Sequence, residues 1–173
     1  MILVESDVSG EWDCRGDWPA LADRTVRAAV AASGFSKLSA SETAFEVSVK
    51  FASDDEVRAL NAAWRAKDEP TNVLSFPMIE PALIGTIAGG GGGGEALLGD
   101  VILAFGVCAR EAAEKGVEIE THAAHLIVHG TLHLLGYDHE TGDADAETME
   151  KIERHALAAI GISDPYPAEE VQT

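Results

Sequence analysis

The strongest constraint on this chain is a group of three histidines in the stretch HGTLHLLGYDH, residues 129–139. His129 and His133 stand four residues apart in an apolar segment, so a helix places their side chains one turn apart on the same face. Gly136 can take the left-handed conformation that ends a helix, which turns the chain so that His139 approaches the pair. The sequence therefore predicts three nitrogen donors that meet at the end of one helix.

This donor set predicts a metal centre. Neutral imidazoles suit zinc, and three protein ligands leave one coordination position for water, which is typical of a catalytic site. We therefore expect His129, His133 and His139 to hold one zinc ion per chain. A closed structural site would need a fourth ligand, and the two cysteines, Cys14 and Cys108, show neither metal-binding spacing nor a CxxC pair.

Two more histidines continue the same side of this predicted helix. His122 and His125 precede His129 at intervals of three and four residues. Such histidines can tune metal ligands or touch a substrate, and more often they support a site or pack in the core. The spacing leaves both roles open.

Apolar periodicity and capping residues predict an α+β fold. Helices are predicted at residues 18–33, 53–66, 107–115, 121–135 and 144–160, and strands at residues 2–8, 45–51, 72–76 and 100–104. The elements alternate without a regular repeat, which favours one domain over residues 1–173 with a small mixed sheet packed with about five helices, one of them a zinc helix like that of metalloproteases. Six glycines at residues 89–94 predict a flexible loop, because no GK with a following Ser or Thr is present.

Charge and hydropathy limit the partners. The formal net charge of −18 opposes nonspecific binding to nucleic acid. Acids concentrate between residues 140 and 170, where we expect a solvated helix face and tail. The acids of this run are Glu140, Asp143, Asp145, Glu147, Glu150, Glu153, Asp164, Glu169 and Glu170. No stretch approaches the roughly 20 apolar residues of a membrane span and no signal-peptide pattern is present, so a cytoplasmic location without membrane contact is expected.

A zinc metalloprotease is one alternative. The interval HxxxHxxGxxH also occurs in metzincin proteases, where a glutamate follows the first histidine and acts as general base. Here Gly130 stands at that position. Without a carboxylate to take a proton from a metal-bound water, peptide hydrolysis lacks its usual apparatus, and this interpretation ranks second.

Three motifs in the same order resemble one known family. HGTLHLLGYDH, together with LNAAWRAKDEPTNVLSFP at residues 60–77 and LGD at residues 98–100, resembles the YbeY family of bacterial endoribonucleases, with the likeness running over residues 45–139. The resemblance implies a single-strand-specific, metal-dependent endoribonuclease in ribosomal RNA maturation, at the 3′ end of 16S RNA, and in ribosome quality control. Its partners would be precursor ribosomal RNA, proteins of the small ribosomal subunit and a maturation GTPase. Zinc would activate a water or a substrate hydroxyl to attack the phosphodiester.

The resemblance also implies roles for single residues. Arg65 matches the functionally important arginine of the family, and its guanidinium would neutralise charge that grows on the phosphate during cleavage. Asp100 in LGD would orient the site, contact a partner or cap backbone groups. We expect Arg58, Arg65 and Lys67 to form a basic cluster that guides RNA, and His125 and Lys67 are the weak candidates for a general acid.

One further alternative is a ribosome-associated binding factor. In that case zinc would only hold the fold, and chelation would unfold the protein. A histidine-to-alanine variant that cleaves RNA as fast as the parent would favour this interpretation.

Overall fold

The computed structural model of the chain describes residues 1–13, 16–138 and 142–166. Five residues named above lie outside these ranges: Cys14, His139, Glu140, Glu169 and Glu170.

Four strands form a single mixed sheet within the described residues. They are β1 (Ile2–Val8), β2 (Ala44–Ala52), β3 (Val73–Pro77) and β4 (Glu95–Ala104), in the order β1-β2-β4-β3. β1, β2 and β4 are parallel, while β3 runs antiparallel to β4 and forms one edge. The predicted mixed sheet is confirmed, and β4 starts five residues earlier than predicted because Glu95 already pairs with Ala44.

The described residues contain seven α-helices and a 3-10 helix. These are α1 (Gly10–Asp13), α2 (Trp18–Ala32), the 3-10 helix Ser36–Ala40, α3 (Asp54–Arg65), α4 (Pro81–Ala88), α5 (Phe105–Lys115), α6 (Ile119–Leu134) and α7 (Asp143–Ala159). The five predicted helices are confirmed, whereas α1 and α4 were not predicted. Within these same ranges, none of the helices has the length and apolar character needed to cross a membrane.

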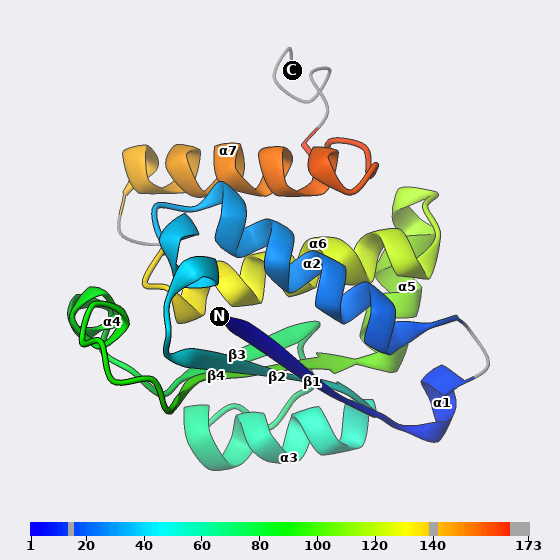
Figure 1. Cartoon of the computed structure of the whole chain (residues 1–173). Helices are drawn as coiled ribbons and strands as arrows, with labels where there is room; N and C mark the ends of the chain where they lie inside the picture. The colour runs from blue at the N-terminus through cyan, green and yellow to red at the C-terminus, as the bar shows by residue number, and fades with distance from the viewer. Residues whose placement is uncertain (14–15, 139–141, 167–173) are drawn as a thin grey trace.

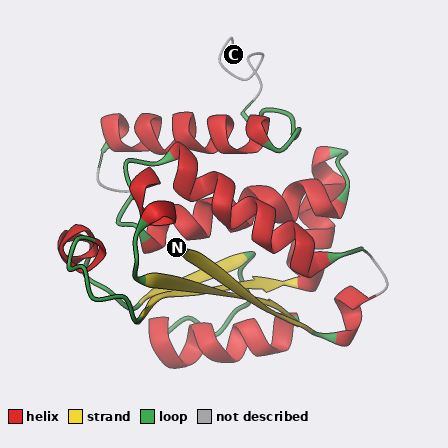
Figure 2. Ribbon diagram, in the orientation of Figure 1, coloured by secondary structure: helices red, strands yellow, loops and turns green. Residues whose placement is uncertain are grey.

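The elements stack in layers (Figures 1 and 2). α3 covers one face of the sheet, α2 and α6 cover the other, and α7 lies across α2 and α6 on their outer side. Side chains of β4 alternate between the layers: Val101 and Leu103 join the main core below α6, and Ile102 joins a smaller cluster with Val57 of α3. The main core thus fixes α6, the histidine helix, against the sheet.

Gly130 allows α6 to lie unusually close to the sheet. A Cβ atom at residue 130 would lie 2.8 Å from Cγ1 and 3.2 Å from Cγ2 of Val101 in β4. The helix therefore packs its backbone directly on the strand at this point. Because residue 130 faces the sheet, a glutamate there would have no room, and the metalloprotease interpretation loses the position of its general base.

α6 ends in the glycine turn that the sequence predicts. Gly136 has a φ of +99°, its N–H donates to the His133 carbonyl over 3.0 Å, and the Tyr137 N–H donates to the Leu132 carbonyl over 3.0 Å. These bonds satisfy carbonyls at the helix end and reverse the chain. The reversal predicted to follow His133 is confirmed.

Candidate active site

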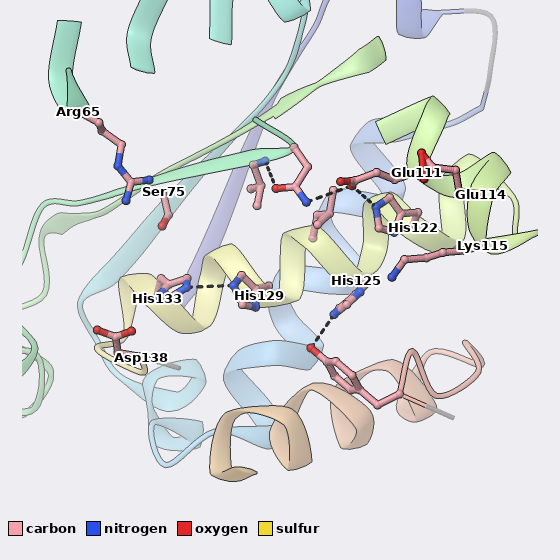
Figure 3. Close-up of a pocket in the computed structure, with 14 residues that line it drawn as sticks. Arg65, Ser75, Glu111, Glu114, Lys115, His122, His125, His129, His133 and Asp138 are labelled. Carbon is pink, nitrogen blue, oxygen red and sulfur yellow. Dashed lines mark hydrogen bonds and ion pairs between the residues drawn. The ribbon is translucent and has the colours of Figure 1, made fainter. Parts of the chain in front are cut away.

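A cavity of about 720 Å³ opens between α6 and the edge strand β3 (Figure 3). Four histidines of α6, a guanidinium, an ammonium and several carboxylates line it. The ionisable side chains of its lining are Arg65, Glu111, Glu114, Lys115, His122, His125, His129, His133, Asp138 and Tyr166. The structure therefore brings Arg65, from α3, into one cavity with His129 and His133 from α6.

His129 and His133 face each other through their Nε2 atoms, which lie 3.1 Å apart. Two ligands of a tetrahedral zinc ion, each about 2.05 Å from the metal, would be separated by about 3.3 Å. The observed spacing therefore fits a pair of nitrogen donors to one ion. The third predicted ligand, His139, lies outside the described residues, and within those residues no three His, Cys, Asp or Glu side chains form a metal-binding group.

A buried carboxylate fixes the orientation of His129. Glu153 of α7 has no exposed surface, and its Oε2 accepts a hydrogen bond from His129 Nδ1 over 2.5 Å. An ionised carboxylate only accepts hydrogen bonds, so Nδ1 carries the proton and Nε2 presents its lone pair toward His133. A carboxylate behind a histidine is the usual support of a metal-binding imidazole.

Tyr166 and His125 complete the surroundings of this carboxylate. The Tyr166 hydroxyl donates to Glu153 Oε1 over 2.5 Å, and His125 Nε2 lies 3.2 Å from the same hydroxyl and 3.6 Å from Oε1. Burial by itself would raise the pKa of Glu153, but the bonds with His125, His129 and Tyr166 outweigh it and lower the pKa to about 2. Glu153 is therefore an anion that three side chains stabilise.

The segment after α7 is tied back so that Tyr166 reaches the cavity. Asp164 Oδ1 accepts a hydrogen bond from the Tyr166 N–H over 2.7 Å and from Arg154 Nε over 3.1 Å. The Arg154 guanidinium also lies 5.3 Å from the centre of the Tyr166 ring. The sequence patterns did not point to Glu153 or Tyr166 as site residues. The expectation of a solvated acidic face is wrong at Glu153, because this side of α7 packs on α6.

The geometry of a loop explains how Arg65 reaches the cavity. Arg65 ends α3, and Ala66 takes a left-handed conformation with φ 57° and ψ 30°. The buried Asn61 side chain donates from Nδ2 to the Glu69 backbone carbonyl over 2.8 Å. The backbone carbonyl of Asn61 accepts from the Lys67 N–H over 3.2 Å. The loop is therefore held at the edge of the sheet, and the Arg65 side chain extends toward Ser75 of β3 (Figure 3).

Of the basic residues predicted to guide RNA, Arg65 lines the cavity and Arg58 pairs with an acid beside it. Arg58 makes a bidentate ion pair with Asp68, in which Nε donates to Oδ1 over 2.8 Å and Nη2 donates to Oδ2 over 3.1 Å. The hydrogen bond and the charge of Arg58 lower the pKa of Asp68. Lys67 is not part of the described cavity lining. Arg65 is the member of the trio that lines the cavity, and its positive charge has no ion pair among the described residues.

Neither Asp100 nor Cys108 is among the described residues that line the cavity. Asp100 is half-buried on β4, on the same face as Ile102 and opposite Val101, and burial raises its pKa. An orienting role toward the histidines is not supported, because α6 lies on the other face. Cys108 is fully buried in the core, and burial raises the pKa of its thiol far above the ordinary value.

His122 lies at the end of the cavity away from His133. It is buried, and its Nε2 donates to Glu111 Oε1 over 2.7 Å. Burial lowers the pKa of His122 and outweighs the opposing effect of the bond to Glu111. Its predicted place on the histidine side of α6 is confirmed by the cavity lining.

Paired imidazoles, a buried carboxylate behind one of them and a guanidinium at the rim are typical of a hydrolase with an anionic substrate. Comparison with known proteins identifies the family: the model described as Endoribonuclease YbeY matches residues 17–161. The chain belongs to this endoribonuclease family, so the predicted family and enzyme class are confirmed.

Individual relatives agree with this assignment. The chain is 53% identical to an Endoribonuclease YbeY of Novosphingobium aromaticivorans, over 97% of this chain and 98% of the relative. It is 52% identical to that of Zymomonas mobilis, over 96% of this chain and 93% of the relative. The solution structure of TM1509 from Thermotoga maritima matches with a TM-score of 0.52 and 23% identity, over 96% of this chain and 99% of the other, which supports the fold alone.

Proposed function

We propose that this chain is a metal-dependent endoribonuclease that cuts single-stranded RNA in the cavity between α6 and β3. The observation that carries the proposal is the pair of Nε2 atoms of His129 and His133, 3.1 Å apart, with a buried carboxylate behind His129. His129, His133 and His139 would be the metal ligands. Zinc is the proposed metal, because its preferred donors are neutral imidazoles.

A metal ion bound there would supply Lewis-acid chemistry at the phosphodiester and lower the pKa of water. The protein would contribute the orientation of the ligands. Glu153 keeps the proton of His129 on Nδ1, and Tyr166 holds the second oxygen of Glu153. Arg65 would neutralise the negative charge that develops on the phosphate oxygens, as a guanidinium does with two parallel N–H donors.

The proposed substrate is precursor ribosomal RNA, with cleavage near the 3′ end of 16S RNA and a role in ribosome quality control. The support for it is the family of the chain. A net charge of −18 weakens capture of naked RNA, so proteins of the small ribosomal subunit and a maturation GTPase are proposed as partners that deliver it. A cytoplasmic location follows from this substrate.

The test combines metal analysis with cleavage of precursor ribosomal RNA. We expect about one zinc ion per parent chain, and less metal with loss of cleavage in His129→Ala. Arg65→Ala should keep its metal and lose at least about 100-fold in kcat/KM, the usual effect of removing one stabilising donor. Arg27→Ala, which removes an exposed arginine on α2, serves as the matched control.

Two results would overturn the proposal. The first is RNA cleavage by His129→Ala at the parent rate, which would favour a binding factor with structural zinc. The second is an Arg65→Ala variant that cleaves as fast as Arg27→Ala. Peptide hydrolysis lost in His129→Ala would instead support the protease.

A further inference from the structure

Three side chains meet at the end of the cavity away from His133, where Figure 3 shows Glu111 and His122. Glu111 lies on α5 and His122 on α6, and Asn72 directly precedes β3. Glu111 Oε1 accepts from His122 Nε2 over 2.7 Å and from Asn72 Nδ2 over 3.1 Å. Asn72 is itself fixed, because its Oδ1 accepts from the Val73 N–H over 2.7 Å. One oxygen of Glu111 is therefore held rigidly by two donors.

The other oxygen of Glu111 is available to a ligand. Its side chain is 32% exposed and lines the cavity, and no described residue donates a hydrogen bond to Oε2. A fixed carboxylate of this kind presents an acceptor in a defined direction. Within the described residues this cluster does not form a metal-binding group. Because an ionised carboxylate only accepts hydrogen bonds, the partner of this oxygen is an N–H or O–H donor.

The distance along α6 relates this acceptor to the imidazole pair. His122 precedes His129 by seven residues, which is about 10 Å at 1.5 Å per residue. A stacked nucleic-acid strand advances about 3.4 Å per nucleotide, so this length corresponds to about three nucleotides. An RNA strand with its scissile phosphate at His129 and His133 would therefore carry a nucleotide to Glu111.

We propose that Glu111, held by Asn72 and His122, is a nucleotide-reading subsite about three positions from the scissile phosphate. This inference rests on the proposed function. The ligand is a hydrogen-bond donor of a ribonucleotide: the exocyclic amine of cytosine, adenine or guanine, or the ribose 2′-hydroxyl. The negative charge of Glu111 excludes the phosphate from this position, and Lys115, which lines the same end, offers the phosphate a partner.

The substitution Glu111→Gln tests the direction of this hydrogen bond. The glutamine oxygen would keep the two donors Asn72 and His122, so its NH2 group would point into the cavity as a donor. A subsite that reads an amine should then shift its preference from cytosine toward uracil, which carries a keto oxygen at the ring position of the cytosine amine. Glu118→Gln, an exposed position in the turn before α6, removes the same charge without touching the cavity and is the matched control.

The measurement is kcat/KM on single-stranded RNAs that differ at one nucleotide within four positions of the cut. At one position we expect the parent and Glu118→Gln to prefer bases with an exocyclic amine over uracil by about ten-fold, and Glu111→Gln to lose or invert this preference. If the ligand is the 2′-hydroxyl, a 2′-deoxy nucleotide there lowers parent cleavage about ten-fold, base changes have no effect, and Glu111→Gln no longer distinguishes ribose from deoxyribose.

The inference is overturned if Glu111→Gln keeps every base and sugar preference of the parent. This holds also if the Glu111→Gln protein is less stable than the parent. If Glu111→Gln does not fold, a parent enzyme without any such preference overturns it equally. Failure of the proposed function looks different, because then the parent does not cleave RNA or His129→Ala cleaves as fast as the parent.

Discussion

Glu153 provides the sharpest test of how the site is built. The carboxylate joins α7 to α6 by accepting from His129 Nδ1 and to the following segment by accepting from the Tyr166 hydroxyl, each over 2.5 Å. Replacing it separates two effects: the stability of the fold and the orientation of His129. We consider Glu153→Ala, Glu153→Gln and Tyr166→Phe, with the exposed Glu147→Gln on the same helix as control.

The expected cost follows from the contacts. Glu153→Ala leaves two donors without their acceptor, at about 1–3 kcal/mol each. His129 is 22% exposed and Tyr166 is half-buried, so water replaces part of the loss, and we expect about 3 kcal/mol in total. Glu153→Gln keeps the volume and one acceptor oxygen, so it should cost about 1–2 kcal/mol. Zinc affinity should fall about 10- to 100-fold, the usual effect of losing the partner of a metal-binding imidazole.

Urea unfolding without metal measures the first effect, and competition with a chelator measures the second. The ¹⁵N shifts of metal-free protein report the tautomer of His129, which should be fixed with Nδ1 protonated in the parent and mixed in Glu153→Ala. Tyr166→Phe should weaken zinc binding less than Glu153→Gln does. Zinc affinity in Glu153→Gln equal to that of Glu147→Gln, with an unchanged tautomer, would show that Glu153 does not orient His129.

Three other expectations concern the core and its ionisable groups. Gly130→Ala should destabilise the protein by about 1 kcal/mol, since overpacking costs about 1–3 kcal/mol and the better helix propensity of alanine offsets up to about 1 kcal/mol. In urea unfolding, the double variant Gly130→Ala/Val101→Ala should lose less stability than the sum of the two single variants. Additive losses would contradict the close contact of residue 130 with Val101. Cys108, in a Cys14→Ser background, should react with a thiol reagent only on unfolding, because burial raises its pKa; rapid reaction of the native protein would disprove this. The pKa of His122 is lowered in the fold, so the unfolded state binds more protons below about pH 6.5 and the free energy of unfolding falls on acidification. His122→Asn should reduce the slope of the free energy of unfolding against pH by up to about 1.4 kcal/mol per pH unit. An unchanged slope would show that the pKa of His122 is not lowered.

Local patterns predicted the elements that have strong local signals. Ser53 was expected to begin a helix, and its side chain accepts from the Glu56 N–H over 3.1 Å. The alternating residues of β2 are buried on one face, as a period of two requires. α4 was missed, because it has eight residues with Gly85 inside, and its stability depends on tertiary burial of Ile84.

The candidate site was only partly readable from the chain. The imidazole pair follows from a spacing of four on one helix, and Arg65 was identified through its motif. Glu153 gave no signal, because an acid on a helix rich in acids has the same pattern whether it faces water or a histidine. Glu111 was invisible for the same reason: its partner His122 is eleven residues away on another helix. Pairings of this kind depend on packing angles that no local pattern contains.

The charges around the cavity connect the proposed metal to the proposed binding of RNA. Among the described lining residues outside the imidazoles, three carboxylates (Glu111, Glu114 and Asp138) outnumber two cations (Arg65 and Lys115), so an approaching phosphate meets a net negative surface. One divalent ion reverses the sign, and a change of two charges at about 4 Å in water corresponds to about 2 kcal/mol, which larger separations reduce.

We therefore expect single-stranded RNA to bind on the order of ten-fold more tightly after one equivalent of zinc is added to metal-free protein, as measured by stopped-flow anisotropy before strand cleavage. His133→Ala removes one donor nitrogen, so zinc should leave its RNA affinity almost unchanged. Equal RNA binding by the parent with and without zinc would show that the carboxylates do not oppose the phosphate. In that case the acidic lining would have to be screened by Arg65 and Lys115 alone, and the dependence of this site on a metal would be limited to the chemical step.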